Sequence, residues 1–232
     1  MSHVPMNNRL LLRLPPEDLA ALMPLLEEVS LNLKQVVIEP AVVIQYVYFP
    51  ESCVCSILAR TDHVNPIEVG MVGFEGMTDM VLREGDRTPL RAIIQLPGTA
   101  WRMKAVDFAQ AIQTYRSLNY TVMRFKEALA IQFAYTALAH GSFTIEERLA
   151  RWLLMSHDRA RKDTMPLVHE FMAAMLAVRR SGVTTAIHIL EGSGAIRAAR
   201  GIITIRDREK LEEFASGSYG VPEAEYERLM AG

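Results

Sequence analysis

The sequence predicts an α+β fold with a β-rich N-terminal half, one long helix and a C-terminal half that ends in a β-hairpin. Three observations support it. Residues 31–103 alternate short apolar segments with Pro, Gly, Asn and Asp, residues 116–139 carry an unbroken helical pattern, and residues 167–206 read as helix, turn, helix and hairpin. The chain has 232 residues and is 50% hydrophobic, which suits one large domain or two modest domains with real cores.

The stretch 167–206 contains two short helices with facing apolar stripes. The spacing of three and four residues is that of one buried helical face, in Phe171, Met172, Met175 and Leu176 and then in Val183, Ile187 and Leu190. Ala177 and Val178 leave room only for a sharp turn between them. We expect Ser181 to cap the second helix, and Gly192 and Gly194 to end it. The segment is therefore predicted to be a helix-turn-helix.

The exposed face of the second helix indicates nucleic-acid chemistry. Ser181, Thr185 and His188 share the face opposite the apolar stripe, and no acidic residue occurs from 179 to 190. The N-terminal end of this face is flanked by Arg179, Arg180 and Thr184. Arg can bond the guanine edge bidentately, and hydroxyls reach bases or phosphates. We assign Arg180, Ser181 and Thr185 to bases and Arg179 and Thr184 to phosphate, with His188 an additional contact.

A β-hairpin around Arg200 and Gly201 follows and is predicted to be a wing. Its arginines, Arg197 and Arg200, are placed to touch the DNA backbone. Residues 179–208 carry six arginines against two acidic residues, a local charge of +4 in a chain whose net charge is −2. A solvated surface is the alternative interpretation of such a run. The helix-turn-helix context favours DNA.

These residues resemble the winged helix of the Crp–Fnr family of bacterial transcription regulators. The resemblance covers about residues 145–215 and rests on PLVHEFMAAMLAVRRSGVTTAIHILEGSGAI followed by RGIITIRD. It implies an N-terminal β-roll of jelly-roll type at 1–109, a dimerisation helix at 110–141 and a winged helix-turn-helix at 142–232. Val168 stands where the family commonly has a capping Thr. Ser181 and Thr185 stand where the best-known members carry Glu and Arg, so their operator cannot be assumed.

The β-rich half is predicted to begin after an amphipathic helix at Pro15–Glu28. Seven short strands are then expected, a number typical of a sandwich or barrel, at 31–33, 36–38, 46–49, 53–59, 67–72, 91–96 and 100–103. On the resemblance, these strands form a roll that senses a ligand.

A cyclic-nucleotide site would use Glu75 for the ribose and Arg87 with Thr88 for the phosphate, as the resemblance implies. Phe74 interrupts the Gly-Glu turn, Pro89 removes a backbone donor, and the long helix lacks base-contacting hydroxyls from 122 to 135. We favour the interpretation that these are ordinary loop residues, and expect no cyclic nucleotide. A different effector, or none, stays open.

Neither a metal site nor an enzyme is expected. The two cysteines, Cys53 and Cys55, supply at most half of a zinc or iron–sulfur site and are expected in the core, so no iron–sulfur cluster is predicted. His63 stands alone between His3 and His140, which leaves a cupin-like metalloenzyme without its ligands. Nor does the chain contain a phosphate loop or nucleophile elbow.

The longest predicted helix, Arg116–Ala139, would extend about 36 Å. One apolar stripe is close to a coiled-coil seam, with Leu118, Val122, Phe125, Leu129 and Phe133; a second contains Met123, Ala130, Ile131 and Ala134. One could pack on the roll and the other on a partner, although a single core helix in a monomer is the alternative. A homodimer would place two recognition helices about 34 Å apart and predicts a pseudo-palindromic operator.

The last helices follow Gly141 and Ser142, the predicted domain boundary. Thr144 and Glu147 are predicted to form a capping box at the start of a helix that ends at Arg159. Residues 209–215 are predicted to form a last short helix, and the acidic tail from Val221 is expected to be mobile. Without a signal peptide or a long apolar span, we expect a cytoplasmic protein.

The predicted function is that of a homodimeric transcription regulator that binds specific sequences of double-stranded DNA. RNA polymerase is a further candidate partner, and no membrane partner is expected. The alternative is a ligand-binding or protein-interaction module that does not bind DNA.

Overall fold

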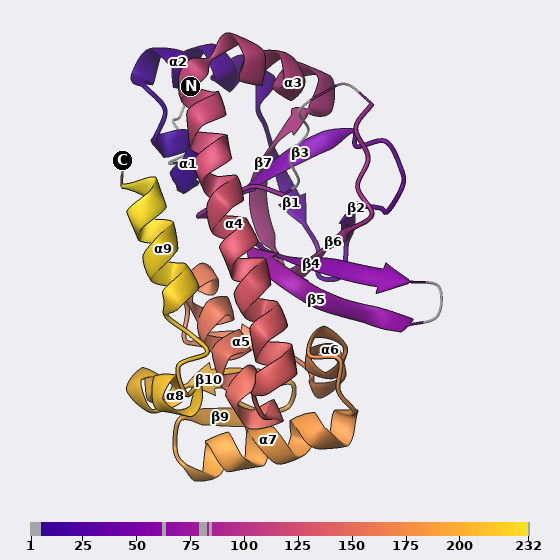
Figure 1. Cartoon of the computed structure of the whole chain (residues 1–232), viewed down its shortest axis with the longest axis vertical. Helices are drawn as coiled ribbons and strands as arrows, with labels where there is room; N and C mark the ends of the chain where they lie inside the picture. Colours follow the sequence, from indigo (N-terminus) through magenta and orange to yellow (C-terminus); the bar gives the residue numbers. More distant parts are fainter. Residues whose placement is uncertain (1–5, 62–63, 79–82, 84, 232) are drawn as a thin grey trace. The chain divides into compact units, whose positions relative to one another are not determined.

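The computed structural model describes residues 6–61, 64–78, 83 and 85–231, and it has the predicted α+β class (Figure 1). The chain divides into two compact units. One comprises residues 1–57 and 72–127, and the other comprises residues 58–71 and 128–232. The boundaries predicted from the sequence, 1–109, 110–141 and 142–232, stay predictions. His63, named above, lies outside the described residues.

The β-rich half contains two antiparallel sheets. The first has the order β1–β7–β3, with β1 at Glu27–Leu31, β7 at Gly98–Lys104 and β3 at Tyr46–Pro50. The second has the order β2–β6–β4–β5, with β2 at Val36–Ile38, β6 at Arg91–Leu96, β4 at Val54–Thr61 and β5 at Val64–Val72. Six of the seven predicted strand segments thus coincide closely with a strand, whereas the segment 31–33 meets β1 only at Leu31. Buried side chains such as Val47, Phe49 and Ile94 form the core of this half.

The N-terminal helical region differs from the prediction. The expected helix at 15–28 is wrong in extent: α2 covers Pro16–Leu22 and a 3-10 helix covers Met23–Leu25. Pro24 has no N–H for a helical bond, and Glu27 and Glu28 pair instead with Arg102 and Trp101 of β7. An unpredicted helix, α1 at Arg9–Leu12, precedes it and is capped by the buried Asn8.

Helix α4 is longer than predicted. It covers Arg116–Ser142, 27 residues, and so includes Gly141 and Ser142, which lie beyond the predicted end of the helix at Ala139. It follows α3 at Ala105–Thr114. The stripe formed by Leu118, Val122, Phe125 and Leu129 is buried within the chain. In the second stripe Met123, Ala130 and Ala134 are exposed and Ile131 is half-buried. Helix α4 therefore has an apolar face that the described part of the chain leaves largely uncovered.

The C-terminal part contains the predicted helix-turn-helix and wing, with two additions. The helices are α5 at Ile145–Ala160, α6 at His169–Met175, α7 at Arg180–Gly192 and α8 at Arg208–Phe214. The wing is a three-stranded sheet of order β8–β10–β9, at Thr164–Pro166, Ile202–Ile205 and Ile196–Ala199. Strand β8 was not predicted.

The acidic tail is also not as predicted. From Val221 to Met230 the chain forms helix α9, so the expectation of a mobile tail is wrong. Buried Leu229 and Met230 anchor its end, and the buried guanidinium of Arg151 holds the preceding segment by donating to the Ser218 carbonyl at 2.9 Å. Among the described residues, no helix has both the length and the apolar character needed to cross a membrane.

Candidate nucleic-acid interface

The turn between α6 and α7 is closed by main-chain hydrogen bonds. Ala177 takes a left-handed conformation, with φ of 51°. The N–H of Val178 donates to the Ala173 carbonyl at 3.0 Å, and that of Ala177 donates to the Ala174 carbonyl at 3.2 Å. These two bonds form a Schellman motif, which ends α6 and turns the chain sharply into α7. The predicted break at Ala177 and Val178 is confirmed (Figure 1).

Helix α7 presents the face that the sequence predicts. Ser181, Thr185 and His188 are exposed, whereas Val183, Ile187 and Leu190 are buried on the opposite side. The predicted N-cap is wrong. Arg179 occupies the cap position without a side-chain bond, and Ser181 lies inside the first turn. The first N–H groups of α7 therefore keep no side-chain cap, and the exposed Arg179 and Arg180 lie beside them.

The threonine hydroxyls on α7 are oriented by their own helix. Thr185 donates to the Ser181 carbonyl at 3.1 Å, and Thr184 donates to the Arg180 carbonyl at 3.0 Å. The Thr184 oxygen also lies 3.1 Å from Nδ1 of His169 on α6. Since the Thr184 hydroxyl proton is already used, Nδ1 of His169 is the donor in this contact. This bond between the two helices was not predicted, because 15 residues separate its partners in the sequence.

The rear of α7 packs closely on the rest of its unit. A Cβ at Gly182 would lie 3.0 Å from Cδ1 of Ile145 in α5, so a small residue permits this approach. Gly194, with φ of 84°, ends α7 as predicted. Oε1 of Glu191 accepts the N–H of Ala198 in β9 at 2.9 Å and thereby joins α7 to the wing. This role of Glu191 was also not predicted.

Strands β9 and β10 of the wing form a tight hairpin with Arg200 in its turn. Arg200 and Gly201 form a two-residue turn in which both have positive φ, 51° and 77°. Such a turn matches the twist of the strands it joins, with Ala199 paired to Ile202. Arg197 and Arg200 are both exposed. The two predicted phosphate contacts of the wing are therefore accessible.

The basic residues of 179–208 do not all have the same environment. Arg208 is engaged inside its unit: it pairs with Asp158 at 2.8 Å and with Glu212 at 2.9 Å, and it donates to the Tyr219 hydroxyl at 2.7 Å. Arg179, Arg180, Arg197 and Arg200 are exposed. The positive charge available to a ligand thus lies at the start of α7 and on the wing.

The predicted effector residues of the roll make local bonds. The carboxylate of Glu75 is buried and accepts the N–H of Gly73 at 3.0 Å. Arg87 is exposed and reaches the Ala41 carbonyl at 3.4 Å, and the Thr88 hydroxyl oxygen accepts the N–H of Leu90 at 3.1 Å. Their use as an effector pocket stays a prediction.

Both cysteines lie in the core, as predicted. Cys53 and Cys55 are buried free thiols, and burial raises the pKa of Cys53 to about 12. Such a thiol stays protonated at neutral pH and is a poor metal ligand or nucleophile. Within the described ranges, no cluster of three or more His, Cys, Asp or Glu side chains is arranged to hold a metal ion.

Comparison with known proteins agrees with this geometry. Residues 147–214 match the family described as the Crp-like helix-turn-helix domain. A putative transcriptional regulator of the Crp/Fnr family from Eubacterium rectale is 13% identical, with a TM-score of 0.68 over 90% of this chain and 98% of that one. FixK2 from Bradyrhizobium japonicum is 15% identical, with a TM-score of 0.68 over 82% and 96%.

A third solved structure, a putative cyclic nucleotide binding protein from Ruegeria pomeroyi, is 16% identical, with a TM-score of 0.59 over 94% of this chain and 100% of that one. No curated protein matches the chain. The fold and the site define a winged helix-turn-helix protein with a β-roll. Residues 147–214 match the Crp-like helix-turn-helix domain, and 90% of the chain shares the fold of the Crp/Fnr-family structure from Eubacterium rectale.

Proposed function

We propose that this protein is a transcription regulator that binds specific sequences of double-stranded DNA as a homodimer. The observation that carries the proposal is the open face of α7. It combines two exposed arginines and exposed hydroxyl side chains with an uncapped helix start, and residues 179–190 include no acidic residue. This combination suits the edges of bases and the phosphates of the major groove.

Individual residues take different roles in the proposed complex. Arg180, Ser181 and Thr185 read bases, with His188 further along the same face. Because the Thr185 proton is donated to the Ser181 carbonyl, its oxygen presents lone pairs outward. Such an acceptor suits the exocyclic amino group of adenine or cytosine. Phosphate is held by Arg179, Arg197 and Arg200, and Thr184 joins them when its hydroxyl proton turns from the Arg180 carbonyl to a phosphate oxygen.

The homodimer is proposed to form along α4. Its uncovered face carries exposed Tyr120, Met123 and Leu138 together with the small residues Ala130 and Ala134. Small residues let two helices approach closely, and burying the three large side chains stabilises the contact. A two-fold dimer would present two α7 helices about one turn of DNA apart, about 34 Å, to a pseudo-palindromic operator.

The remaining parts of the proposal are a cytoplasmic location, no enzymatic activity, and RNA polymerase as a candidate partner. The rival is a module whose winged helix contacts protein and never DNA. Salt dependence separates them, because each neutralised phosphate steepens the fall of log affinity with log salt by about 0.9. We expect a steep slope for the purified protein on duplex DNA, and the rival predicts no binding at low salt.

Two arginine variants test the assigned roles. Arg180→Ala should cost about 1–3 kcal/mol on the preferred duplex and relax the preference at one base pair. Arg179→Ala should weaken binding to all duplexes alike and make the salt slope shallower by about 1. Arg228→Ala is the matched control, since Arg228 lies on α9 and pairs with Glu225 at 2.7 Å. An equal loss for Arg180→Ala on every sequence would place Arg180 among the phosphate contacts.

A further inference from the structure

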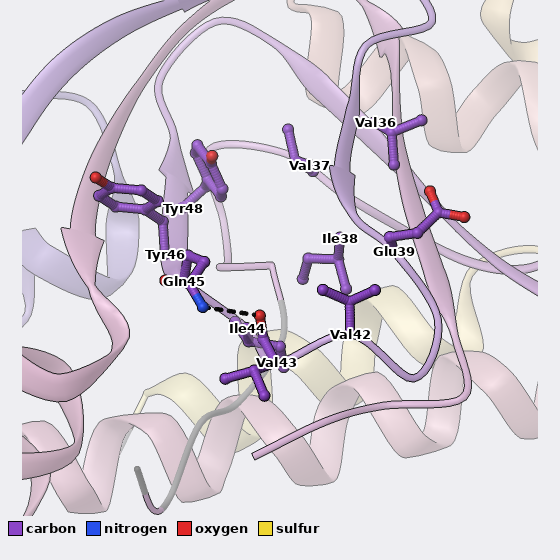
Figure 2. A pocket seen from close by; sticks show the side chains of 10 residues that line it. All are labelled: Val36, Val37, Ile38, Glu39, Val42, Val43, Ile44, Gln45, Tyr46 and Tyr48. Atoms are coloured by element: carbon purple, nitrogen blue, oxygen red, sulfur yellow. Dashed lines mark hydrogen bonds between the residues drawn. The ribbon is translucent and has the colours of Figure 1, made fainter. Parts of the chain in front are cut away.

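The roll contains a hollow that is separate from the predicted effector residues. Its volume is about 200 Å³, and one continuous stretch of chain lines it, including Val36, Ile38, Val42, Ile44, Tyr46 and Tyr48 (Figure 2). Glu75, Arg87 and Thr88 are not among the described lining residues. The hollow lies entirely in the first unit.

The walls of the hollow are fixed by backbone pairing. Strands β2 and β3 are edge strands of different sheets, and the segment between them is pinned from outside. Val43 forms a β-bridge with Arg87, Ala41 donates to the Thr88 carbonyl at 2.8 Å, and the Ile44 N–H donates to the Asp86 carbonyl at 3.1 Å. These bonds fix the backbone around the hollow, and a preformed site has a lower conformational cost of binding.

The lining favours a neutral ligand. Among the described lining residues, Glu39 is the charged one, and its carboxylate forms an ion pair with Arg91 at 3.0 Å. The same set includes no Lys, Arg or His, and two guanidinium groups beside it are already paired with carboxylates, Arg91 with Glu39 and Arg102 with Glu27. The lining itself therefore offers no free counter-charge to an anionic phosphate. Val36 and Val42 are 39% and 54% exposed at this site. Covering their aliphatic surface would favour an apolar occupant.

Aromatic side chains supply the polar groups of the hollow. The rings of Tyr46 and Tyr48 lie 6.4 Å apart and tilted by 53°, and the guanidinium of Arg102 lies 4.4 Å over the Tyr46 ring. Burial raises the pKa of Tyr48, and its hydroxyl oxygen accepts a hydrogen bond from Arg102, so the neutral hydroxyl keeps its own proton to donate to a ligand. An aromatic ligand can pack edge-to-face against such rings.

We propose that this hollow binds a small neutral aromatic molecule with one hydrogen-bonding group, of the size of a phenol or an indole. An apolar cavity of about 150 Å³ holds benzene, so the hollow has room for a benzene ring with a small addition. Mostly apolar lining with a few polar groups is typical of small-molecule sites. The inference goes beyond the proposed function and does not depend on DNA binding.

Indole is the probe that tests the site. Amide NMR of the full chain with millimolar indole should show shifts concentrated at residues 36–48, whereas cyclic AMP should leave these amides unchanged. Val42→Arg should weaken indole binding at least tenfold. The matched control is Val106→Arg on α3, because Val106 is a similarly exposed valine, at 46%, and does not line the hollow. A thermal melt of each variant checks folding, and Val36→Arg replaces Val42→Arg if the latter unfolds.

Three results would overturn the proposal: no shifts at 36–48 with indole, equal indole affinity in wild type and the hollow variants, or shifts there with cyclic AMP alone. DNA binding is measured on the same samples without indole, where Val42→Arg should bind as wild type does. If the wild-type chain binds DNA but not indole, the indole site is rejected and the proposed function stands. Indole binding by a chain that never binds DNA rejects the proposed function only.

Discussion

The indole Nε1 of Trp152 donates a hydrogen bond to Oε1 of the buried Glu68 at 2.9 Å. This bond joins α5 to β5 within the second unit. Gln132 of α4 adds two bonds to the same strand: its Oε1 accepts the N–H of Met71 at 2.6 Å, and its Nε2 donates to the Met71 carbonyl at 3.2 Å. The second half of β5 is therefore hydrogen-bonded to both α4 and α5.

Trp152→Phe should destabilise the protein by about 1–3 kcal/mol, because it leaves a buried carboxylate oxygen without its donor. Trp101→Phe is the matched control. Its Nε1 is buried and has no hydrogen-bond partner in the described part of the chain, so the same change removes no bond. Urea unfolding measures both. Equal destabilisation of the two variants would mean that ring packing, and not the bond to Glu68, is responsible.

Stability should fall as the pH decreases from about 7 to about 4, in part through His140. Burial, followed by the nearby Arg148 charge, lowers the pKa of His140 to about 4. Its Nε2 faces the Glu68 carbonyl and its Nδ1 faces Arg148, while Arg151 adds a weaker repulsion. His140 takes up a proton near pH 6.5 in the unfolded chain but only near pH 4 in the folded chain. The unfolding free energy therefore decreases between these two pH values, and below pH 4 His140 causes no further decrease.

His140→Asn is the comparison for this pH dependence, since Asn does not titrate. The difference in unfolding free energy between the wild type and this variant should change by about 1–2 kcal/mol between pH 7 and pH 4, less than the full pKa shift would give, because the ring is only part-buried. Urea unfolding at several pH values measures it. A difference that stays constant with pH would contradict the assigned environment of His140.

Gly98→Ala should cost about 2 kcal/mol or more. A Cβ there would lie 2.6 Å from the backbone N of Cys53, and backbone cannot move aside as a flexible side chain can. Gly141→Ala is the opposite case. It lies in α4 with nothing within 4 Å of the added Cβ, and Ala favours a helix by about 0.5–1 kcal/mol. Thermal melting should therefore shift in opposite directions, and two shifts of the same sign would be inconsistent with the structure.

Charge and turn conformation can be separated at the tip of the wing. Arg200→Asn should keep the turn, because Asn tolerates positive φ, and should reduce the salt slope of DNA binding by about 1. Gly201→Ala should instead destabilise the wing, since φ there is 77° and a Cβ would lie 3.0 Å from Val168. Anisotropy titrations and melting curves distinguish the two. Unchanged salt dependence in Arg200→Asn would remove Arg200 from the phosphate contacts.

The C-terminal helices and the exposed face of α7 could be predicted because their signals are local. The capping box of Thr144 and Glu147 and the break at Ala177 are confirmed, and the exposed set on α7 follows from helical spacing alone. Strand β8 has only three residues and includes Pro166, so its identity depends on pairing with β10. Helix α9 was not predicted because its sequence is acidic and has few apolar residues at helical spacing.

Parts of the site that depend on tertiary contacts could not be predicted. The His169–Thr184 bond and the Glu191 bond to Ala198 join elements whose proximity only the fold creates. The hollow at 36–48 depends likewise on the pairing of residues 41–44 with residues 86–88. The spacing of apolar residues shows which face of a helix or strand is buried, but not which residues of other elements contact that face.

Selection of binding sites from random duplex DNA by the purified full chain tests the central claim most directly. The account predicts enrichment of a pseudo-palindrome whose half-sites lie about one helical turn, about 34 Å, apart. It also predicts that Arg180→Ala relaxes the selected base at one position of each half-site. No enriched sequence at low salt, either alone or with indole or cyclic AMP present, would contradict a regulator that reads DNA through α7.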